Sequence, residues 1–242
     1  MAKLSSTTLF HFTPSIDTLE KILETGLWPR YCVEHDWGDK DLVIPMVCTC
    51  DIPLSEIKFH QEKYGKYGIG LNKTWAKAQG FTPILYVSDK SDICNRLISF
   101  LKKCSMEAIS LKNINLDERY LLPFLKRYTG TSVDKKRLKL DKIPKFINEH
   151  EWRYIPLKKD VNFLVVPKGD GQSYNCDEAN RVTSKMKLTF QPKSIEYIFI
   201  QNESERIYVI NMIERIYKGK HNDEVKTLIS KIISREQIVK DF

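Results

Sequence analysis

Near the start of the chain, hydrophobic and polar residues first alternate one by one, as in a strand. The hydrophobic residues then recur every three to four positions, as in a helix. The segment TLFHFT, residues 8–13, predicts a strand with His11 and Thr13 on one face and two phenylalanines on the other. Apolar residues then recur at helical spacing, with Ser15 suited to the N-cap and Gly26 to the C-terminal stop. The chain therefore begins with a predicted strand, a tight turn and a helix.

The same patterns predict a mixture of short strands and helices along the rest of the chain. Further strands are expected at 43–50, 67–71, 83–87, 150–156, 161–166, 187–191 and 195–200. Further helices are expected at 53–64, 89–103, 117–128, 177–185, 203–218 and 222–233, with a short one capped by Asn72. The segment before residue 43 and the basic segment after residue 128 are expected to be loops. Together these elements predict an α+β fold with a mixed, mostly antiparallel sheet, inserted helices and a helical C-terminus. The expected organisation is one α+β domain over 1–202, with a helical extension at 203–242 packed on it.

Composition is that of a globular protein outside the membrane. Of the 242 residues, 42% are hydrophobic and 29% charged, and no apolar run approaches the ~18–20 residues that span a bilayer. The N-terminus lacks the apolar region of a signal peptide, so we expect a cytoplasmic protein. Cys48 and Cys50 could both ligate one metal ion, with Cys32, His35 and His60 nearby. Zinc sites usually show wider cysteine pairs, however, and no metal is expected.

The net charge of +8 favours partners that carry phosphate, although only as a bias. The densest basic stretch is residues 133–145, where Lys135, Lys136, Arg137 and Lys139 gather. This stretch suits either a weak nucleic-acid contact or a solvated loop. Because no aromatic side chain is interleaved with the lysines, the solvated loop is the favoured alternative.

Two polar clusters lie at predicted strands in the first third of the chain. His11 with Thr13 is the first, and a lone strand histidine is most often structural. The second is YGKYGIGL, where Tyr64 and Tyr67 accompany three glycines including Gly68. Glycine lets a ligand approach the backbone and tyrosine can stack on a flat ring, but an ordinary tight turn with core aromatics explains the pattern as well.

The third cluster lies in EHEWRYIP, where Glu151 and Arg153 share one face of a predicted strand. Buried charges are costly unless paired, so one interpretation is an ion pair that holds the strand to its neighbour. The other is a carboxylate at the floor of a cleft, with Arg153 orienting it or binding a ligand phosphate. Trp152 and Tyr154 are expected to pack into the core on the reverse face.

The segments LFHFT…LEKILETGLWPRY, IPMVCTCDIPLSEIKFHQEKYGKYGIGLNKTWA, EHEWRY and IISREQIVKDF together resemble the AbiGi family of bacterial abortive phage-infection proteins. That family is usually labelled as antitoxins. More distantly, the opening His-x-Thr strand followed by LEKILETGL is similar to the start of DarT-type ADP-ribosyltransferases.

The second resemblance implies an ADP-ribosyltransferase-like fold with NAD as substrate, and it implies a distinct role for each site residue. His11, with Thr13 nearby, would bind the adenosine-side ribose. Tyr67, or second to it Tyr64, would stack on nicotinamide beside Gly68. Glu151 would stabilise the oxocarbenium-like state and activate the acceptor, because a fixed carboxylate offsets the positive charge that develops on the ribose. The serine-containing second motif of the toxin subclass is not found in the sequence.

Two functions therefore remain open. One is an NAD-consuming ADP-ribosyltransferase-like protein of phage defence that acts on a protein or nucleic-acid acceptor. The other is a non-catalytic antitoxin that binds a cognate toxin or another defence-system protein. Nucleic-acid binding through residues 133–145 is a third and weaker possibility.

Overall fold

The structure is a computed structural model that describes residues 5–103, 108–110, 118–130, 142–156, 161–170 and 176–241. It divides into two compact units. Unit 1 comprises Met1–Leu27, Cys48–Phe81 and Leu188–Phe242, and unit 2 comprises Trp28–Val47 and Thr82–Lys187. The chain therefore passes between the units four times, after residues 27, 47, 81 and 187. Each unit is described by itself.

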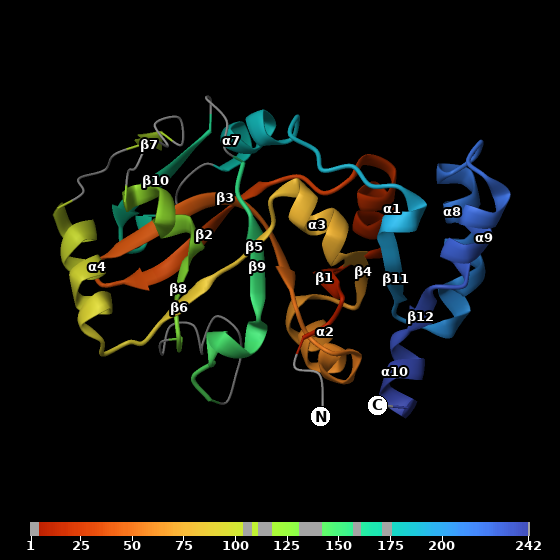
Figure 1. The fold of residues 1–242 in the computed structure, drawn as a ribbon, viewed down its shortest axis with the longest axis horizontal. Coiled ribbons are helices and arrows are strands. Elements are labelled where there is room, and N and C mark those ends of the chain that lie inside the picture. The colour runs from red at the N-terminus through yellow and green to blue at the C-terminus, as the bar shows by residue number, and fades with distance from the viewer. Residues whose placement is uncertain are drawn as a thin grey trace. The chain divides into compact units, whose positions relative to one another are not determined.

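Unit 1 is built on an antiparallel sheet to which one parallel strand is added (Figure 1). Its strands are β1 (Thr8–Thr13), β4 (Tyr67–Asn72), β11 (Ile195–Ile200), β12 (Ile232–Ser234) and the last residues of β3 (Lys40–Cys50). The order is β12-β11-β4-β1, and β1 then pairs with the end of β3 through Phe10 and Cys50. Only the β11–β12 pair is parallel.

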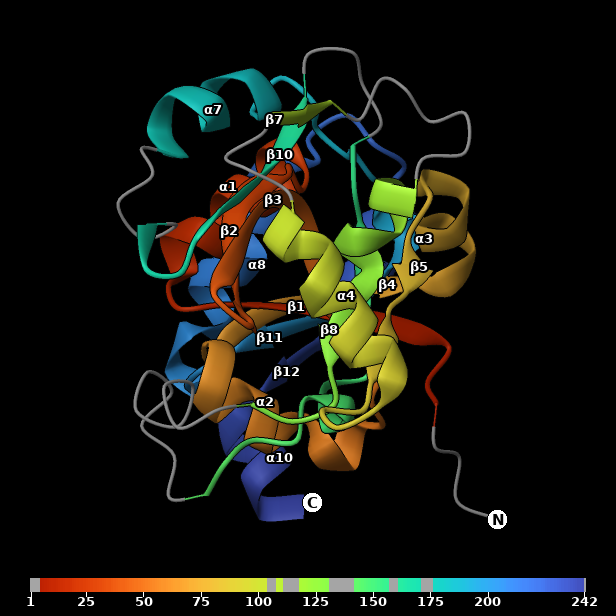
Figure 2. The same ribbon diagram turned by 90° about the vertical axis from the view of Figure 1, so that its left-hand side faces the viewer.

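Helices cover both faces of this sheet, and Figure 2 shows α2 and α10 on the side of the strands opposite α1. The helical elements of unit 1 are α1 (Ile16–Thr25), η1 (Leu54–Glu56), α2 (Ile57–Tyr64), α3 (Lys73–Gln79), η4 (Pro192–Ser194), η5 (Glu203–Glu205), α8 (Arg206–Ile216), α9 (Asn222–Ile229) and α10 (Arg235–Asp241). The predicted caps are confirmed. Ser15 accepts a hydrogen bond from the Thr18 N–H, Asn72 accepts one from the Trp75 N–H, and Gly26 ends α1 with φ 86°.

Aromatic side chains fill the space that the glycines of β4 leave open. Phe10, Phe12 and Phe199 are in mutual ring contact beneath α2 and α10. A Cβ atom built on Gly68 would lie 2.7 Å from both the Phe12 ring and the His11 carbonyl oxygen. Glycine is therefore required here by packing within the sheet, because a larger residue would clash with backbone as well as with a ring.

Unit 2 contains an antiparallel sheet centred on β3 and a separate pair of strands. Its strands are β2 (Arg30–Trp37), residues 40–47 of β3, β5 (Thr82–Pro83), β6 (Leu85–Val87), β7 (Ala108–Ser110), β8 (Leu125–Arg127), β9 (Glu151–Tyr154) and β10 (Asn162–Pro167). The order is β2-β3-β10-β7, with every pair antiparallel. In addition β9 is paired to β3 and pairs antiparallel with β5, whereas β6 and β8 form the separate, parallel pair. The helical elements are α4 (Asp92–Lys103), η2 (Glu118–Phe124), η3 (Phe146–Glu149) and α7 (Cys176–Thr183).

The predicted fold class is confirmed as α+β with a mixed, mostly antiparallel sheet and a helical C-terminus. Several individual elements were predicted wrongly. The expected loop before residue 43 contains β2, which pairs along β3. The helix expected at 117–128 is the 3-10 helix η2, which contains Pro123, followed by β8. Proline has no N–H to donate and disfavours the helical conformation of the residue before it, so a long α-helix cannot run through this segment.

Three other predictions also require correction. Residues 187–191 form no strand, and only Leu188 makes an isolated bridge, to Leu27. The buried strand expected at 83–87 divides into β5 and β6, and Leu85 is 60% exposed. The last predicted helix ends at Ile229, after which β12 adds a strand within the C-terminal segment. The division into a domain at 1–202 and an extension at 203–242 stays a prediction.

Among the helices that the structure describes, none has both the length and the apolar character needed to cross a bilayer.

Candidate functional site

Strand β9 turns its charged residues inward. Arg153 is fully buried and Glu151 is 6% exposed, whereas Trp152 and Tyr154 are only half-buried. The expectation that these aromatics form the buried face is therefore wrong. The charged face can be buried because its groups are paired and hydrogen-bonded, which offsets the cost of removing them from water.

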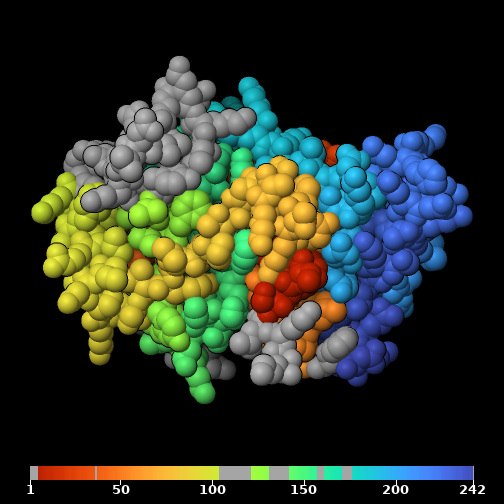
Figure 3. All heavy atoms as spheres, in the orientation of Figure 1, coloured from red at the N-terminus to blue at the C-terminus, as the bar shows by residue number. Residues whose placement is uncertain are grey.

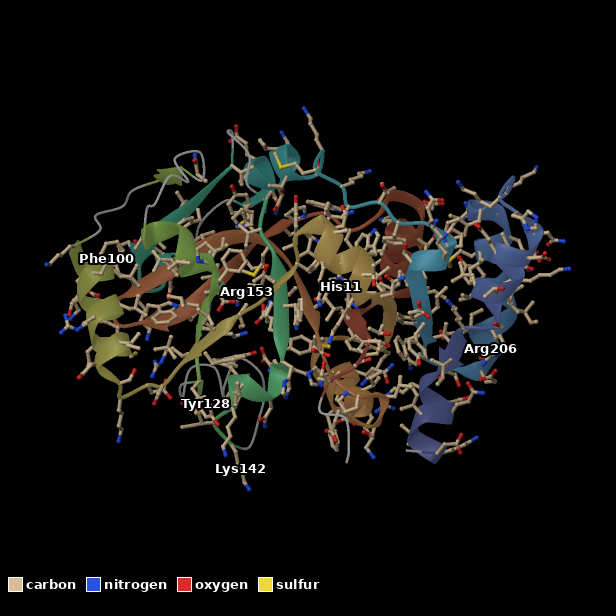
Figure 4. The ribbon with its side chains drawn as sticks, viewed as in Figure 1. His11, Phe100, Tyr128, Lys142, Arg153 and Arg206 are labelled. Carbon is tan, nitrogen blue, oxygen red and sulfur yellow. The ribbon has the colours of Figure 1, made fainter. Side chains whose placement is uncertain are left out.

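The Arg153 guanidinium is surrounded by acceptors within unit 2. Its Nε donates to Glu151 Oε1 at 2.6 Å, and its Nη2 lies 3.2 Å from Glu151 Oε2 and 3.0 Å from Glu34 Oε1. Its Nη1 donates to the Pro123 carbonyl oxygen at 2.7 Å. The two bonds to Glu151 form the bidentate arrangement that makes arginine–carboxylate pairs strong. Figure 4 shows Arg153 among the strands of this unit.

A second cation, Lys126 of β8, also pairs with Glu151. Its Nζ lies 2.8 Å from Glu149 Oε2 and 2.8 Å from Glu151 Oε2, and it sits 4.7 Å from the centre of the Phe146 ring. The hydroxyl of Tyr86 on β6 accepts a hydrogen bond of 3.0 Å from the Glu151 N–H. The side chain and the backbone of Glu151 are thus both held in place.

We call this group the charged core, and it consists of three carboxylates and two cations: Glu34, Glu149, Glu151, Lys126 and Arg153. Burial alone would raise the pKa of Glu151, but Arg153 and Lys126 outweigh it and hold that pKa well below its usual range. Burial would lower the pKa of Lys126, but the three carboxylates raise it well above its usual value. Glu151 and Lys126 are therefore ionised at neutral pH.

The backbone at His150 places Glu149 and Glu151 together. His150 lies between η3 and β9 with φ 45° and ψ 48°, and is the one non-glycine residue with positive φ among those described. Asn, Asp and His are the residues that most often tolerate this left-handed conformation. The bend lets the carboxylates on both sides of His150 reach the Lys126 ammonium.

Sequence reasoning missed four members of this environment. The sequence pattern predicts a loop at Glu34 and a helix at Lys126, whereas both residues lie on strands, so the pattern does not indicate where their side chains point. Glu149 and Tyr86 were not singled out. The short apolar run YCV, residues 31–33, is a weak signal for the strand that carries Glu34, and no local pattern indicates the strand that carries Lys126.

In unit 1, His11 is half-buried on β1. Its Nδ1 lies 2.8 Å from the Cys48 carbonyl oxygen. A carbonyl can only accept, so Nδ1 carries the proton and Nε2 presents a lone pair. Burial lowers the pKa of His11, although the bond to Cys48 acts in the opposite direction. The imidazole is therefore neutral at physiological pH. Thr13, two residues further on the same strand, is buried.

The aromatic candidates of unit 1 differ in exposure. Tyr67 is 8% exposed, and its hydroxyl donates to Glu205 Oε1 at 2.6 Å. Burial and that hydrogen bond raise the pKa of Tyr67 to about 12. Tyr64 is 40% exposed, and the ammonium of Lys63 lies 4.9 Å from the centre of its ring. Of the two rings, that of Tyr64 is the more accessible.

The structure thus gathers the predicted site residues into two groups. His11, Thr13, Tyr67 and Gly68 lie on β1 and β4 of unit 1, where Thr13 pairs with Tyr67 in the antiparallel register. Glu151 and Arg153 bond to one another in unit 2. Tyr64 ends α2 in unit 1.

The basic residues Lys135, Lys136, Arg137 and Lys139 lie outside the described residues. Within the described ranges, no group of three or more His, Cys, Asp or Glu side chains is arranged to hold a metal ion.

Comparison with known proteins gives two matches that agree. Residues 25–201 match the family described as "Putative abortive phage resistance protein AbiGi, antitoxin". The chain is also 31% identical over 225 residues to the abortive phage resistance protein AbiGi of Lactococcus lactis subsp. cremoris, an alignment that covers 84% of this chain and 90% of that protein. No solved structure gives a significant match. The chain belongs to the AbiGi family of abortive phage resistance proteins.

Proposed function

We propose that this protein acts in phage defence as a non-catalytic antitoxin, a folded protein that binds and neutralises a cognate toxin. The family description names an antitoxin, which supports a protein partner. The observation that carries the proposal is the state of Glu151. Its carboxylate receives three charge-assisted hydrogen bonds from Arg153 and Lys126, so it serves to neutralise buried cations.

Proton transfer explains why this arrangement favours binding over catalysis. A general base works best when its pKa lies near the operating pH. The cations beside Glu151 hold its pKa well below the usual range of a carboxyl group. A carboxylate stabilised in this way is a weak base, and the Tyr67 hydroxyl is already bonded to Glu205.

Co-expression and co-purification test the proposal. The chain is expected to form a stable complex with the protein encoded by the neighbouring gene and to relieve that protein's toxicity. A His11→Ala variant, which removes a predicted NAD-binding group, is expected to neutralise the toxin as well as the wild type does. Failure of the wild type to bind or neutralise the neighbouring protein contradicts the proposal.

ADP-ribosyl transfer with NAD is the second candidate, and one specific observation favours it. Glu151 stays ionised and rigidly held, as a carboxylate that stabilises an oxocarbenium-like state must be. In this alternative His11 and Thr13 would bind NAD, Tyr64 or Tyr67 would stack on nicotinamide, and Arg153 would orient Glu151.

Nicotinamide release from NAD separates the two candidates. The antitoxin proposal predicts no turnover by the purified chain, alone or with the neighbouring protein. Turnover that is lost in both Glu151→Gln and His11→Ala, with folding of each variant checked by circular dichroism, supports the transferase instead. The His11 variant is informative even if replacing a member of the charged core unfolds unit 2.

A further inference from the structure

Two neighbouring segments of unit 2 carry exposed apolar side chains beside exposed lysines. Tyr128 is 41% exposed and Ile143 is 52% exposed. The segments are joined by a backbone bond from the Gly130 N–H to the Pro144 carbonyl oxygen at 2.7 Å and by an antiparallel bridge between residues 129 and 145. Atoms of both segments lie next to each other on the visible face in Figure 3, and Figure 4 shows Tyr128 and Lys142 at the same edge.

The charges on these segments are unbalanced at the surface. Between residues 121–130 and 142–150 the sole carboxylate is Glu149, which is buried against Lys126. Lys142 and Lys145 are both exposed, and neither contacts a carboxylate among the described residues. Asp89 also approaches the first segment, but it is paired with Arg127 and Thr129. Neither Asp89 nor Glu149 therefore pairs with Lys142 or Lys145.

The Tyr128 backbone is fixed on both sides. Its N–H donates to the Val87 carbonyl oxygen at 2.8 Å, and its carbonyl accepts from the Ile147 N–H at 3.4 Å. An exposed tyrosine on a fixed backbone loses little entropy when a partner covers it, and tyrosine is enriched among the residues that dominate binding energy at interfaces.

We propose that Tyr128, Ile143, Lys142 and Lys145, which we call the Tyr128 surface, form the docking site for an acidic segment of the cognate toxin that also carries apolar side chains. The proposal rests on the antitoxin function proposed above. Acidic side chains of the partner would complement the lysines, and its apolar side chains would cover Tyr128 and Ile143. An exposed isoleucine favours a protein partner, since single-stranded nucleic acid is bound chiefly by cations and stacked aromatic rings.

The test measures the dissociation constant for the protein encoded by the neighbouring gene. The double variant Tyr128→Ala with Ile143→Ser is expected to weaken binding by ~30-fold or more, the loss typical of a central anchor. The charge reversal Lys142→Glu with Lys145→Glu is expected to slow association and to reduce its dependence on salt. The matched control is Phe59→Ala with Val239→Ser, which removes an exposed aromatic and an exposed aliphatic side chain from unit 1. This control is expected to bind like the wild type.

Each outcome decides between the proposals. If the double variant binds as tightly as the wild type, the Tyr128 surface is not the docking site, while the proposed antitoxin function is unaffected. If the wild type binds no neighbouring protein, both proposals fail together. If a single-stranded oligonucleotide binds the wild type and Tyr128→Ala abolishes that binding, the surface serves nucleic acid and the proposal is overturned. Circular dichroism and hydrogen exchange of each variant establish that the fold is retained.

Discussion

The interiors of units 1 and 2 are stabilised by different kinds of interaction. Unit 1 packs aromatic rings against a strand whose glycines make room for them, so its interior around Phe10 and Phe12 is apolar. Unit 2 places a network of charges behind β9, with Arg153 fully buried among carboxylates. The first arrangement depends on shape, whereas the second depends on every partner being present and ionised. We therefore expect different substitutions and conditions to destabilise the two units.

Removing the central cation should have the largest effect. Arg153→Met leaves the buried Glu151 and the half-buried Glu34 without their shared partner, and breaking a buried ion pair costs about 3–5 kcal/mol in the free energy of unfolding. Urea denaturation measures the loss, and hydrogen exchange should show faster exchange in residues 149–156 than in 195–200. The control Arg215→Met, whose pairs with Glu20 and Glu24 are exposed, should unfold like the wild type. A change of under ~1 kcal/mol for Arg153→Met would contradict the role given to the charged core.

Acid should weaken unit 2 before unit 1. The folded-state pKa of Glu151 lies below that of the unfolded chain, about 4.3, so its contribution is complete above that value and is lost as pH falls through the folded pKa. Hydrogen exchange measured from pH 7 down to pH 3 should show residues 149–156 opening first. Equal opening of both units, or earlier opening of residues 195–200, would argue against a difference in charge dependence.

A methyl group on β4 should disturb unit 1 alone. Gly68→Ala places a Cβ atom 2.7 Å from the His11 carbonyl oxygen and from the Phe12 ring. Overpacking of this kind costs about 1–3 kcal/mol. The midpoint of urea unfolding should fall, with faster exchange in residues 195–200 and little change in residues 149–156. An unchanged midpoint would mean that the strand can shift to accept the methyl group.

The smallest effect should come from relieving the backbone strain at His150, the left-handed residue beside β9. His150→Gly should raise the free energy of unfolding by up to about 1 kcal/mol, because glycine adopts φ 45° without a Cβ clash. His150→Val should lower it, since β-branched residues fit that conformation poorly. If both variants destabilise the chain equally, the imidazole itself contributes contacts that outweigh its backbone conformation.

Local signals predicted unit 1 better than unit 2. Ser15, Gly26 and Asn72 act through residues one turn away, so the sequence alone locates the ends of α1 and α3. Glu34 and Lys126 reach Arg153 and Glu151 from distant positions in the chain, and no local pattern predicts which segments pair. The ion pair proposed between Glu151 and Arg153 is present, but the second cation that completes it was not foreseen.

The four passages of the chain between the units also set the order in which the protein can be completed during synthesis. All the described strands of unit 2 have left the ribosome by the time residue 187 has emerged, and its fold can then form. Strand β4 has only β1 beside it until residues 195–200 supply β11. The nascent chain thus carries β4, with its two glycines, as an open sheet edge while residues 73–194 are synthesised. An unpaired edge of this kind can pair with other chains, so we expect misassembly during synthesis to begin in unit 1.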